Sequence, residues 1–440
     1  MAVSFVWVLF PALLQFAENA GHLIAQDDMG ADYLVAWVWA TVLGSALLIA
    51  PIRFNDKRIL LWGWLVRVAV VLLLMLPYEN HYGLDAYGYF QSRLIQPDPR
   101  YLGFGLGSEN MQAIAWLHQQ VLPDSYHAMK LTCAMIGLIA VFMFCQAART
   151  FVPSNGYPFS WFLLLDPSIT FWSSILGKDP ISLLGVGLYT YGVAKFCTYG
   201  VAKWSATRRT SSLVFVIIGI LIASLIRFWF AVILGVPLLV LFFRLAKSLS
   251  ARIVLVVLII AGVPVLDRVA NSFHVSSTYT LIAQTRSLAS GFHQGGSAIE
   301  PVPQVTGMRS FVVRSPWAVF TALFRPAPGE VNNVFGILAG LEDLCMLLLV
   351  LRAAARTRLG DLKEPPVLWG TAVILCWAMP NGFVTSQNVG SAVRYRLQIL
   401  PILLGLLLYL GRYRRSIARP SGATSLFATS SRSRRISVSQ

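Results

Sequence analysis

Residues 78–90 read YENHYGLDAYGYF and begin the first long polar interruption in a chain that is otherwise mostly apolar. The polar segment lies between two apolar runs that are each long enough to cross a bilayer. It concentrates Glu79, His81 and Asp85 among tyrosines that suit the headgroup level of a lipid bilayer. We interpret this segment as one wall of a site at the membrane surface, and we place the other segments relative to it.

The composition is typical of a membrane protein. Of the 440 residues, 56% are hydrophobic and only 12% are charged, whereas a soluble domain carries about 25% charged residues. Apolar runs of roughly 17–22 residues recur between short polar loops, which indicates an all-α polytopic integral membrane protein. About twelve transmembrane helices are expected, at approximately 3–18, 33–52, 59–77, 128–148, 159–176, 180–202, 211–226, 229–246, 252–268, 334–351, 366–383 and 394–411.

Twelve crossings place both termini on one side, and the loop charges assign that side to the cytoplasm. Lys and Arg gather in the loops on the side of Met1, whereas the opposite loops hold the acidic residues Asp27, Asp28, Asp32, Glu79 and Asp85. The net charge of +16 is therefore mainly topological, and no soluble basic domain is available to bind nucleic acid. We assign 1–411 to a single transmembrane domain, with outer loops 78–127 and 269–333, and 412–440 to a disordered basic cytoplasmic tail.

Both outer loops carry further signals. In the first, residues 109–122 place Met111, Ile114, Leu117 and Val121 near one helical face, which predicts an amphipathic helix lying in the interface. The second loop is rich in positive charge, which is unusual on the outer side, so its cations are expected to have a function there. Among the residues it carries are Arg286, His293, Arg309, Arg314, Arg325 and Glu330.

Four charged residues fall inside the expected spans, namely Arg67, Asp166, Glu342 and Asp343. Each lies roughly 10–14 Å deep at 1.5 Å per residue, and isolated charges at that depth are costly. We therefore predict that Arg67 pairs with one or more of the three acids. An interhelical clamp is the favoured interpretation, and a proton or ion path is the alternative. Asp166 before Pro167 also predicts a helix break, with Asp166 capping the restart.

Several cations border the expected outer face. Lys178 lies beside Asp179 and Pro180, which we interpret as the N-cap and first residue of a helix, and a cation at such an end suits a phosphate. Simple snorkelling is the competing explanation for Lys178. Arg394 and Arg396 open the last span, and paired guanidinium groups suit diphosphate oxygens. Ordinary interfacial arginines remain the alternative for these two.

Three sets of short motifs resemble bacterial polysaccharide-assembly membrane proteins, which include C-type (GT-C) glycosyltransferases and O-antigen or exopolysaccharide polymerases. The motifs cover about a tenth of the chain. They are Pro167-Ser168, Phe171-Trp172-Ser173-Ser174 and Lys178-Asp179; then Arg325-Pro326, Pro328, Glu330 and Leu341-Glu342; and last Arg394-Tyr395-Arg396 with Pro401. The resemblance implies a location in the bacterial inner membrane and a polyprenyl-phosphate-linked sugar donor used on the periplasmic face. The partners would be a lipid-linked saccharide donor, a saccharide acceptor and membrane lipids.

The resemblance also suggests which residues act. In GT-C enzymes an acidic motif in the first outer loop serves catalysis, and Asp85 is the match here. Asp85 departs from that pattern because it follows the third expected span and not the first. The polymerases instead resemble this chain through arginines in large outer loops. The catalytic candidates are Asp85, Glu79, Glu330 and His293, and the substrate-binding candidates are Lys178, Arg286, Arg309, Arg314, Arg325, Arg394 and Arg396.

Cofactor use stays open at the sequence level. Glu79 and Asp85 are the pair available to a divalent cation, but two carboxylates six residues apart do not define a metal site. The five cysteines have no zinc or disulfide spacing, and we interpret them as small core residues. We therefore assign no metal ligands.

Two other classes of function compete with the enzyme. A transporter or flippase of lipid-linked saccharides would use the same cations for binding without bond chemistry. An inward-facing conformation, or a polar path through Arg67, Asp166 and Glu342, would favour it. A closed inner half beneath an outer cavity would favour the enzyme. A non-catalytic scaffold subunit would leave the arginines dispersed.

Overall fold

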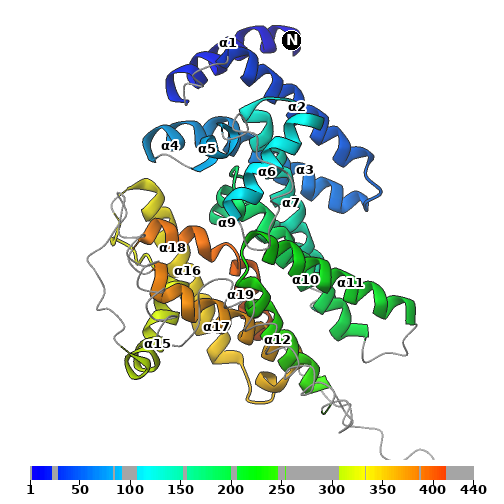
Figure 1. Cartoon of the computed structure of the whole chain (residues 1–440), viewed down its shortest axis with the longest axis vertical. Coiled ribbons are helices and arrows are strands. Elements are labelled where there is room, and N and C mark those ends of the chain that lie inside the picture. The colour runs from blue at the N-terminus through cyan, green and yellow to red at the C-terminus, as the bar shows by residue number, and fades with distance from the viewer. Residues whose placement is uncertain are drawn as a thin grey trace, which may run out of the picture.

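The computed structural model describes residues 2–21, 28–82, 85–91, 107–151, 156–199, 206–245, 253, 307–331, 333–385 and 388–412, and its regular elements there are all helices (Figure 1). The first group comprises α1 (Ala2–Ala20), α2 (Met29–Ile49), α3 (Phe54–Ala69), the π-helical turn η1 (Val70–Leu74), α4 (Met75–Tyr82), α5 (Asp85–Gln91), α6 (Gly107–Val121) and α7 (Tyr126–Phe151). The second comprises α8 (Gly156–Leu165), α9 (Pro167–Trp172), α10 (Lys178–Tyr199), α11 (Ala206–Ile226) and α12 (Phe230–Leu245). The third comprises α15 (Met308–Phe324), α16 (Val334–Arg356), the 3-10 turn η4 (Asp361–Lys363), α17 (Pro365–Thr385), α18 (Val389–Arg396) and α19 (Leu400–Leu410).

The chain has the helices of a membrane protein. Five are long and apolar enough to cross a bilayer: α2, the continuous helix Phe54–Tyr82, α7, α16 and α17. A sixth span results if α18 and α19, which meet at 67°, are counted together. The twelve crossings and the sidedness remain predictions. Among the expected spans, α8, α9 and α12 have only 10, 6 and 16 residues in the part of the chain that the structure describes. The expected span 252–268 and the tail beyond Arg412 lie outside that part.

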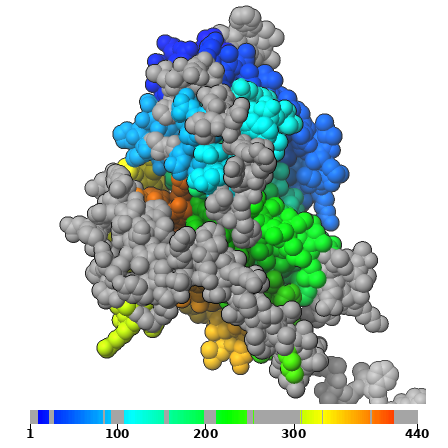
Figure 2. All heavy atoms as spheres, in the orientation of Figure 1, coloured from blue at the N-terminus to red at the C-terminus, as the bar shows by residue number. Residues whose placement is uncertain are grey.

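The helices are arranged along one long axis. The helices α1 to α6 gather at one end and α12 and α15 to α19 toward the other (Figure 1). Figure 2 shows atoms of α1 to α6 covering the upper part of this face, and those of α10 and α11 lying below them on the right. Between the two ends, α7 is buried along most of its length, with α2, α8 and α10 packed around it.

Close backbone approaches fix the start of α10. A Cβ added to Gly137 of α7 would lie 1.9 Å from the Ser173 carbonyl oxygen, so the turn after α9 sits directly on α7. A Cβ on Gly185 of α10 would lie 2.5 Å from the Ala223 amide nitrogen of α11. Small residues allow such close packing between membrane helices. The turn that carries Lys178 and Asp179 is therefore held between α7 and α11.

The predicted break at Asp166 is confirmed. The Asp166 side chain accepts a hydrogen bond from the Ile169 amide at 2.9 Å, and Pro167 occupies the first helical position of α9. A capping carboxylate and a following proline are the usual start of a helix. The expected span 159–176 is therefore two short helices joined at Asp166.

The described portion of the expected outer loop 269–333 contains α15, a helix that the sequence did not predict, and the placement of this segment on the outer side remains a prediction. This helix packs on the C-terminal part of α17, where Phe311 stacks on Phe383 and the Ala318 carbonyl would lie 2.0 Å from a Cβ on Gly382. The helix predicted at 109–122 is confirmed as α6, which ends with Leu117 and Val121 exposed. Its position in a membrane interface remains a prediction.

Candidate functional site

Asp179 lies at the centre of the candidate site. Its carboxylate is fully buried, accepting a hydrogen bond from Arg227 Nη2 at 2.9 Å on Oδ1 and one from Arg394 Nε at 2.6 Å on Oδ2. One acid thus joins the start of α10, the turn between α11 and α12, and α18. The expected N-cap role of Asp179 is wrong, because α10 begins one residue earlier, at Lys178.

Local structure presents both arginines to Asp179. Arg227 opens the turn between α11 and α12, where the Phe230 amide donates to its carbonyl at 3.0 Å. Its guanidinium carbon lies 4.3 Å from the centre of the Tyr395 ring. Arg394 lies on α18, and its guanidinium carbon is 5.9 Å from the Trp172 ring centre. Cation–π contacts of this kind hold guanidinium groups in place without using their N–H donors.

Lys178 connects this cluster to α5 and α6. Its Nζ donates to Ser108 Oγ at 2.8 Å and lies 6.0 Å from the centre of the Tyr89 ring. Asp85, the exposed first residue of α5, interacts electrostatically with Tyr89, Lys178 and Arg394. Burial, followed by the negative charge of Asp85, raises the pKa of Tyr89 to about 12, so its hydroxyl stays protonated. The structure thus brings together the predicted residues Asp85, Lys178 and Arg394.

The cluster keeps hydrogen-bond donors that Asp179 does not use. Arg394 donates to the described residues only through Nε, which leaves Nη1 and Nη2 of its partly exposed side chain. Arg227 Nη1 is buried and has no hydrogen-bond partner among the described residues. Three cations face two carboxylates, at the N-terminus of α10, where the helix dipole adds positive potential. This arrangement suits an anion with several oxygens, such as a phosphate or diphosphate.

Arg396 belongs to a second cluster, in which Arg396 and Asp343 are buried and Glu342 is 13% exposed. Its Nη1 lies 2.5 Å from Asp343 Oδ1 and donates to the Leu323 carbonyl at 2.9 Å, and its Nη2 lies 3.7 Å from Glu342 Oε1. Glu342 Oε2 accepts a hydrogen bond from Ser168 Oγ at 2.5 Å. Because Arg396 is completely buried by its own chain, it is a clamp between α16 and α18 and does not line the candidate site with Arg394.

The predicted pairing of Arg67 is wrong. Arg67 is buried, but it donates to the carbonyls of Gly63 and Leu164 and to Ser173 Oγ, at 3.3, 3.4 and 3.1 Å. It forms no ion pair with Asp166, Glu342 or Asp343, all of which the structure describes. Arg396 takes the role that was expected of Arg67, because it, and not Arg67, faces α16.

The remaining predicted residues lie elsewhere. Glu79 is buried beneath α5, where Lys130 Nζ donates to it at 2.8 Å and Tyr126 Oη at 3.3 Å. Arg325 and Glu330 pair with each other in the turn before α16, and the Ala327 amide also donates to Glu330 at 2.9 Å. Arg309 and Arg314 lie in the first half of α15, and Arg286 and His293 lie outside the described residues.

The described side chains offer no group of three or more His, Cys, Asp or Glu that could hold a metal ion. Glu79 and Asp85, the pair left open for a divalent cation, occupy different environments. Glu79 is buried against Lys130, whereas Asp85 is exposed at the start of α5. We therefore build no step on a metal.

Sequence reasoning missed three members of the cluster: Arg227, Tyr89 and Ser108. Arg227 gave a signal, because a lone arginine between two apolar runs has to lie at a helix end or find an acid. The buried role of Asp179 gave none, since its position before Pro180 is fully explained by helix capping. Tyr89 and Ser108 are ordinary loop residues in sequence, and only the packing of α5 and α6 on Lys178 shows their place.

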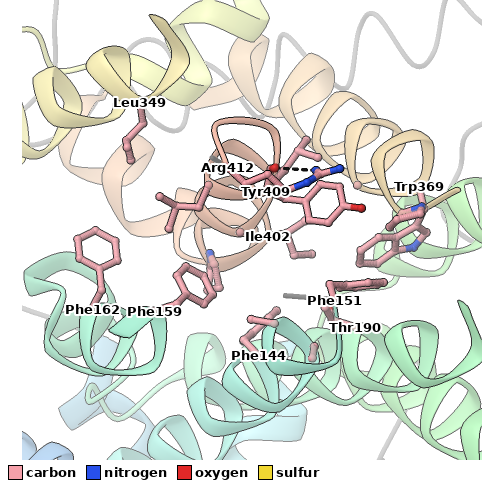
Figure 3. Close-up of a pocket in the computed structure, with 18 of the residues that line it drawn as sticks. Phe144, Phe151, Phe159, Phe162, Thr190, Leu349, Trp369, Ile402, Tyr409 and Arg412 are labelled. Carbon is pink, nitrogen blue, oxygen red and sulfur yellow. Dashed lines mark hydrogen bonds between the residues drawn. The ribbon is translucent and has the colours of Figure 1, made fainter. Parts of the chain in front are cut away.

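A cavity of about 500 Å³ is lined by residues of α7, α8, α10, α16, α17 and α19, and its α19 residues run from Pro401 to Tyr409. Thr190 lines it, twelve residues or about 18 Å along α10 from Lys178. Figure 3 shows Phe159 and Phe162 of α8 on one side of this cavity and Trp369 of α17 on another, with Tyr409 and Arg412 above. The cavity is therefore separate from the cationic cluster.

Comparison with known proteins supplies no relative for this chain: no family model, curated protein or solved structure matches it.

Proposed function

We propose that this protein is a membrane glycosyltransferase or polysaccharide polymerase. It would use a polyprenyl-phosphate- or diphosphate-linked sugar donor on the periplasmic face of a bacterial inner membrane, in cell-surface polysaccharide synthesis. The observation that carries the proposal is the cluster of Lys178, Arg227 and Arg394 around buried Asp179, with exposed Asp85 beside it. The motif resemblance supplies the substrate class, and the cluster supplies a site that fits it.

The cations would bind the donor through its phosphate. Asp179 fixes the orientation of both guanidinium groups, while Arg394 Nη1 and Nη2 stay available to phosphate oxygens. Preorganised donors of this kind stabilise negative charge most effectively where it develops, which here is the departing phosphate. Lys178 adds an ammonium group that uses one donor on Ser108 and retains two.

Asp85 would act as the general base. The acceptor hydroxyl oxygen forms a bond to the anomeric carbon, the bond from that carbon to the phosphate oxygen breaks, and the hydroxyl proton passes to the Asp85 carboxylate. Asp85 is exposed and accepts no hydrogen bond from the described residues, so its oxygens are accessible to an acceptor. Positioned carboxylates contribute roughly 10²–10⁴-fold to such reactions.

The test uses purified protein in vesicles that contain a polyprenyl-diphosphate-linked oligosaccharide. Chain growth and released lipid carrier are measured together, and donor binding is measured separately. Asp85→Asn should lower turnover by roughly 10²–10⁴-fold with donor binding retained. Arg394→Lys should weaken donor binding by about tenfold or more, because a point charge does not reproduce a forked donor.

Two matched variants control for surface charge. Glu109→Gln alters an exposed acid on neighbouring α6, and Arg58→Lys alters an exposed arginine near the start of α3, so both should keep normal turnover. Normal polymer from Asp85→Asn removes that residue from the mechanism. Normal polymer and normal donor binding in Asp85→Asn and Arg394→Lys together would refute the site.

One observation favours the alternative of a transporter or flippase. The cavity lies in the half of the helix bundle that faces the cytoplasm according to the distribution of Lys and Arg in the loops. Its walls are almost entirely apolar, however, and a saccharide needs hydrogen-bond partners along its path. Vesicles with lipid-linked saccharide labelled on one leaflet separate the two functions. Leaflet exchange without chain growth would replace the enzyme by the transporter.

A further inference from the structure

The cavity between α7, α8, α10, α16, α17 and α19 has a size and lining that the proposed function does not use. Its volume of about 500 Å³ lies within the range of roughly 300–1,000 Å³ typical of ligand pockets. Aromatic and aliphatic side chains form most of its wall, among them Phe144, Phe159, Phe162 and Leu406 (Figure 3). The lining is therefore suited to an apolar ligand.

The few polar groups in the wall are already engaged within the protein. Thr190 Oγ1 donates to the Val186 carbonyl at 2.7 Å, Trp369 Nε1 to Tyr189 Oη at 2.8 Å, and Tyr409 Oη to Glu364 Oε2 at 2.6 Å. A polar solute would have to leave its own hydrogen-bonding groups unpaired in this space. A sugar or peptide backbone is thus a poor occupant, and a hydrocarbon chain is a good one.

The mouth of the cavity is cationic. Arg352 of α16 and Arg412 both line it. Arg352 packs against Gly411 at the end of α19, where an added Cβ would lie 3.6 Å from the Arg352 Nε. Arg412 lies over the Tyr409 ring at 3.8 Å and reaches Glu364 at 3.3 Å. Arg352 is exposed and has no hydrogen-bond or ion-pair partner among the described residues. An anionic group at the mouth would therefore meet unused donors.

The side of the cavity is accessible from outside the helix bundle. Phe162, which lines it, is 46% exposed on α8. Three of the surrounding helices, α7, α16 and α17, are among those long enough to span a bilayer. A chain entering laterally between them would place its headgroup at the membrane surface, where anionic lipid attracts arginines.

We propose that this cavity binds an anionic lipid, with one hydrocarbon chain among Phe159, Phe162 and Leu406 and its phosphate on Arg352 and Arg412. The required chemistry is an apolar chain that carries a phosphate. A membrane phospholipid and an isoprenoid phosphate both supply it. The proposal does not depend on the cluster at Asp179, which lies at the far end of α10.

Photocrosslinking of the full-length protein in nanodiscs tests the proposal. Three diazirine probes are compared, each carrying the photoreactive group on its chain: phosphatidylglycerol, phosphatidylcholine and an isoprenyl phosphate. Labelled peptides are mapped by mass spectrometry. We expect labelling of α8 and α19 by an anionic probe, and whichever anionic probe labels them more strongly identifies the source of the lipid.

Two kinds of variant sharpen the result. Among the described residues, a Cβ on Gly405 would meet only Phe159, at 3.7 Å, so Gly405→Leu should fill the cavity and reduce labelling by about tenfold. Its matched control is Gly235→Leu on α12, where a Cβ would meet no described residue within 4 Å and labelling should not change. Arg352→Gln alters an exposed side chain that has no hydrogen-bond or ion-pair partner among the described residues, and it should reduce labelling by the anionic probes alone.

Equal labelling by phosphatidylcholine and the anionic probes would overturn the choice of an anionic lipid. Labelling that survives Gly405→Leu in a protein that still elutes as a monodisperse peak would show that the probes bind the outer surface of the bundle. Arg352→Gln keeps the test decisive if Gly405→Leu fails to fold, because unchanged anionic labelling in that variant removes the headgroup site.

Discussion

Asp179 and Arg394 are 215 residues apart in sequence, yet Arg394 Nε donates to Asp179 Oδ2 at 2.6 Å in the interior of the protein. The same carboxylate holds Arg227 through its other oxygen, at 2.9 Å. The Asp179 carboxylate therefore holds together α10, α18 and the turn between α11 and α12. The proposed donor site depends on that meeting.

The first prediction concerns the Asp179 carboxylate. Asp179→Asn leaves buried Arg227 and partly exposed Arg394 without their counter-ion, and breaking a buried ion pair such as Asp179–Arg227 costs about 3–5 kcal/mol. We expect a clearly lower midpoint of thermal unfolding for the detergent-purified protein, followed by tryptophan fluorescence. Glu109→Gln, which alters an exposed side chain of α6, is the control and should leave the midpoint unchanged. An unchanged midpoint in Asp179→Asn would mean that the two arginines do not need this charge.

The second prediction concerns Arg396 and Asp343, whose side chains are 0% and 1% exposed. Either Arg396→Met or Asp343→Leu alone should cost about 3–5 kcal/mol, because each leaves one buried charge unpaired. The double variant should cost much less than the sum, since an apolar pair of similar volume replaces the ion pair. A double-mutant cycle of unfolding free energies measures the coupling. Simple additivity would contradict the pairing.

The third prediction follows from the corrected partners of Arg67. The Arg67 guanidinium is buried with no acidic partner among the described residues. Arg67→Met therefore loses three hydrogen bonds but no longer buries a charge, and it should change the free energy of unfolding by no more than about 1 kcal/mol. Ser173→Ala keeps the charge but removes one acceptor, so it should cost about 1.5–3 kcal/mol. Thermal unfolding of the two variants measures the change in stability that each substitution causes, and the two changes are compared. Severe loss of folded protein in Arg67→Met alone would show that the hydrogen bonds outweigh desolvation.

The sequence predicted where helices lie better than it predicted which helices meet. Apolar runs and the Asp166-Pro167 cap depend on neighbouring residues, so the helices and the break were accessible. The helix α15 was not predicted, because Arg309, Arg314 and Pro316 interrupt its apolar run and lower the mean hydropathy. The depth of a residue along a membrane helix can be counted from the sequence, but the sequence does not say which other helices lie beside that residue. For that reason the acids of α16 were given to Arg67 and not to Arg396.

The candidate site was predictable in part for the same reason. Lys178, Arg394 and Asp85 were found because each lies at the boundary of an apolar run, where interfacial chemistry is expected. Glu79 occupies a similar sequence position, but it points inward to Lys130. Which side of α4 is buried depends on α7 packing against it, and no short pattern in the sequence encodes that contact.

The last prediction concerns His118 on α6. Its Nε2 lies 2.9 Å from Thr132 Oγ1, and that hydroxyl already donates to the Ala128 carbonyl, so Nε2–H is the donor to Thr132. His118 Nδ1 is buried and has no hydrogen-bond partner among the described residues, so a proton there would gain no acceptor among them. Burial lowers the pKa of His118 to about 4, against the opposing field of Asp124.

The sign of the effect follows from linkage. The unfolded chain takes up a proton on His118 near pH 6.5, whereas the folded protein does so only near pH 4. The contribution of His118 to stability is therefore fully present above about pH 6.5 and is lost as the pH falls from there toward 4. We expect thermal unfolding midpoints at about pH 7 and about pH 5 to differ less in His118→Gln than in the unchanged protein, because glutamine can still donate to Thr132 but does not titrate. An identical pH dependence in both proteins would show that His118 is not buried in its neutral form and that α6 packs differently on α7.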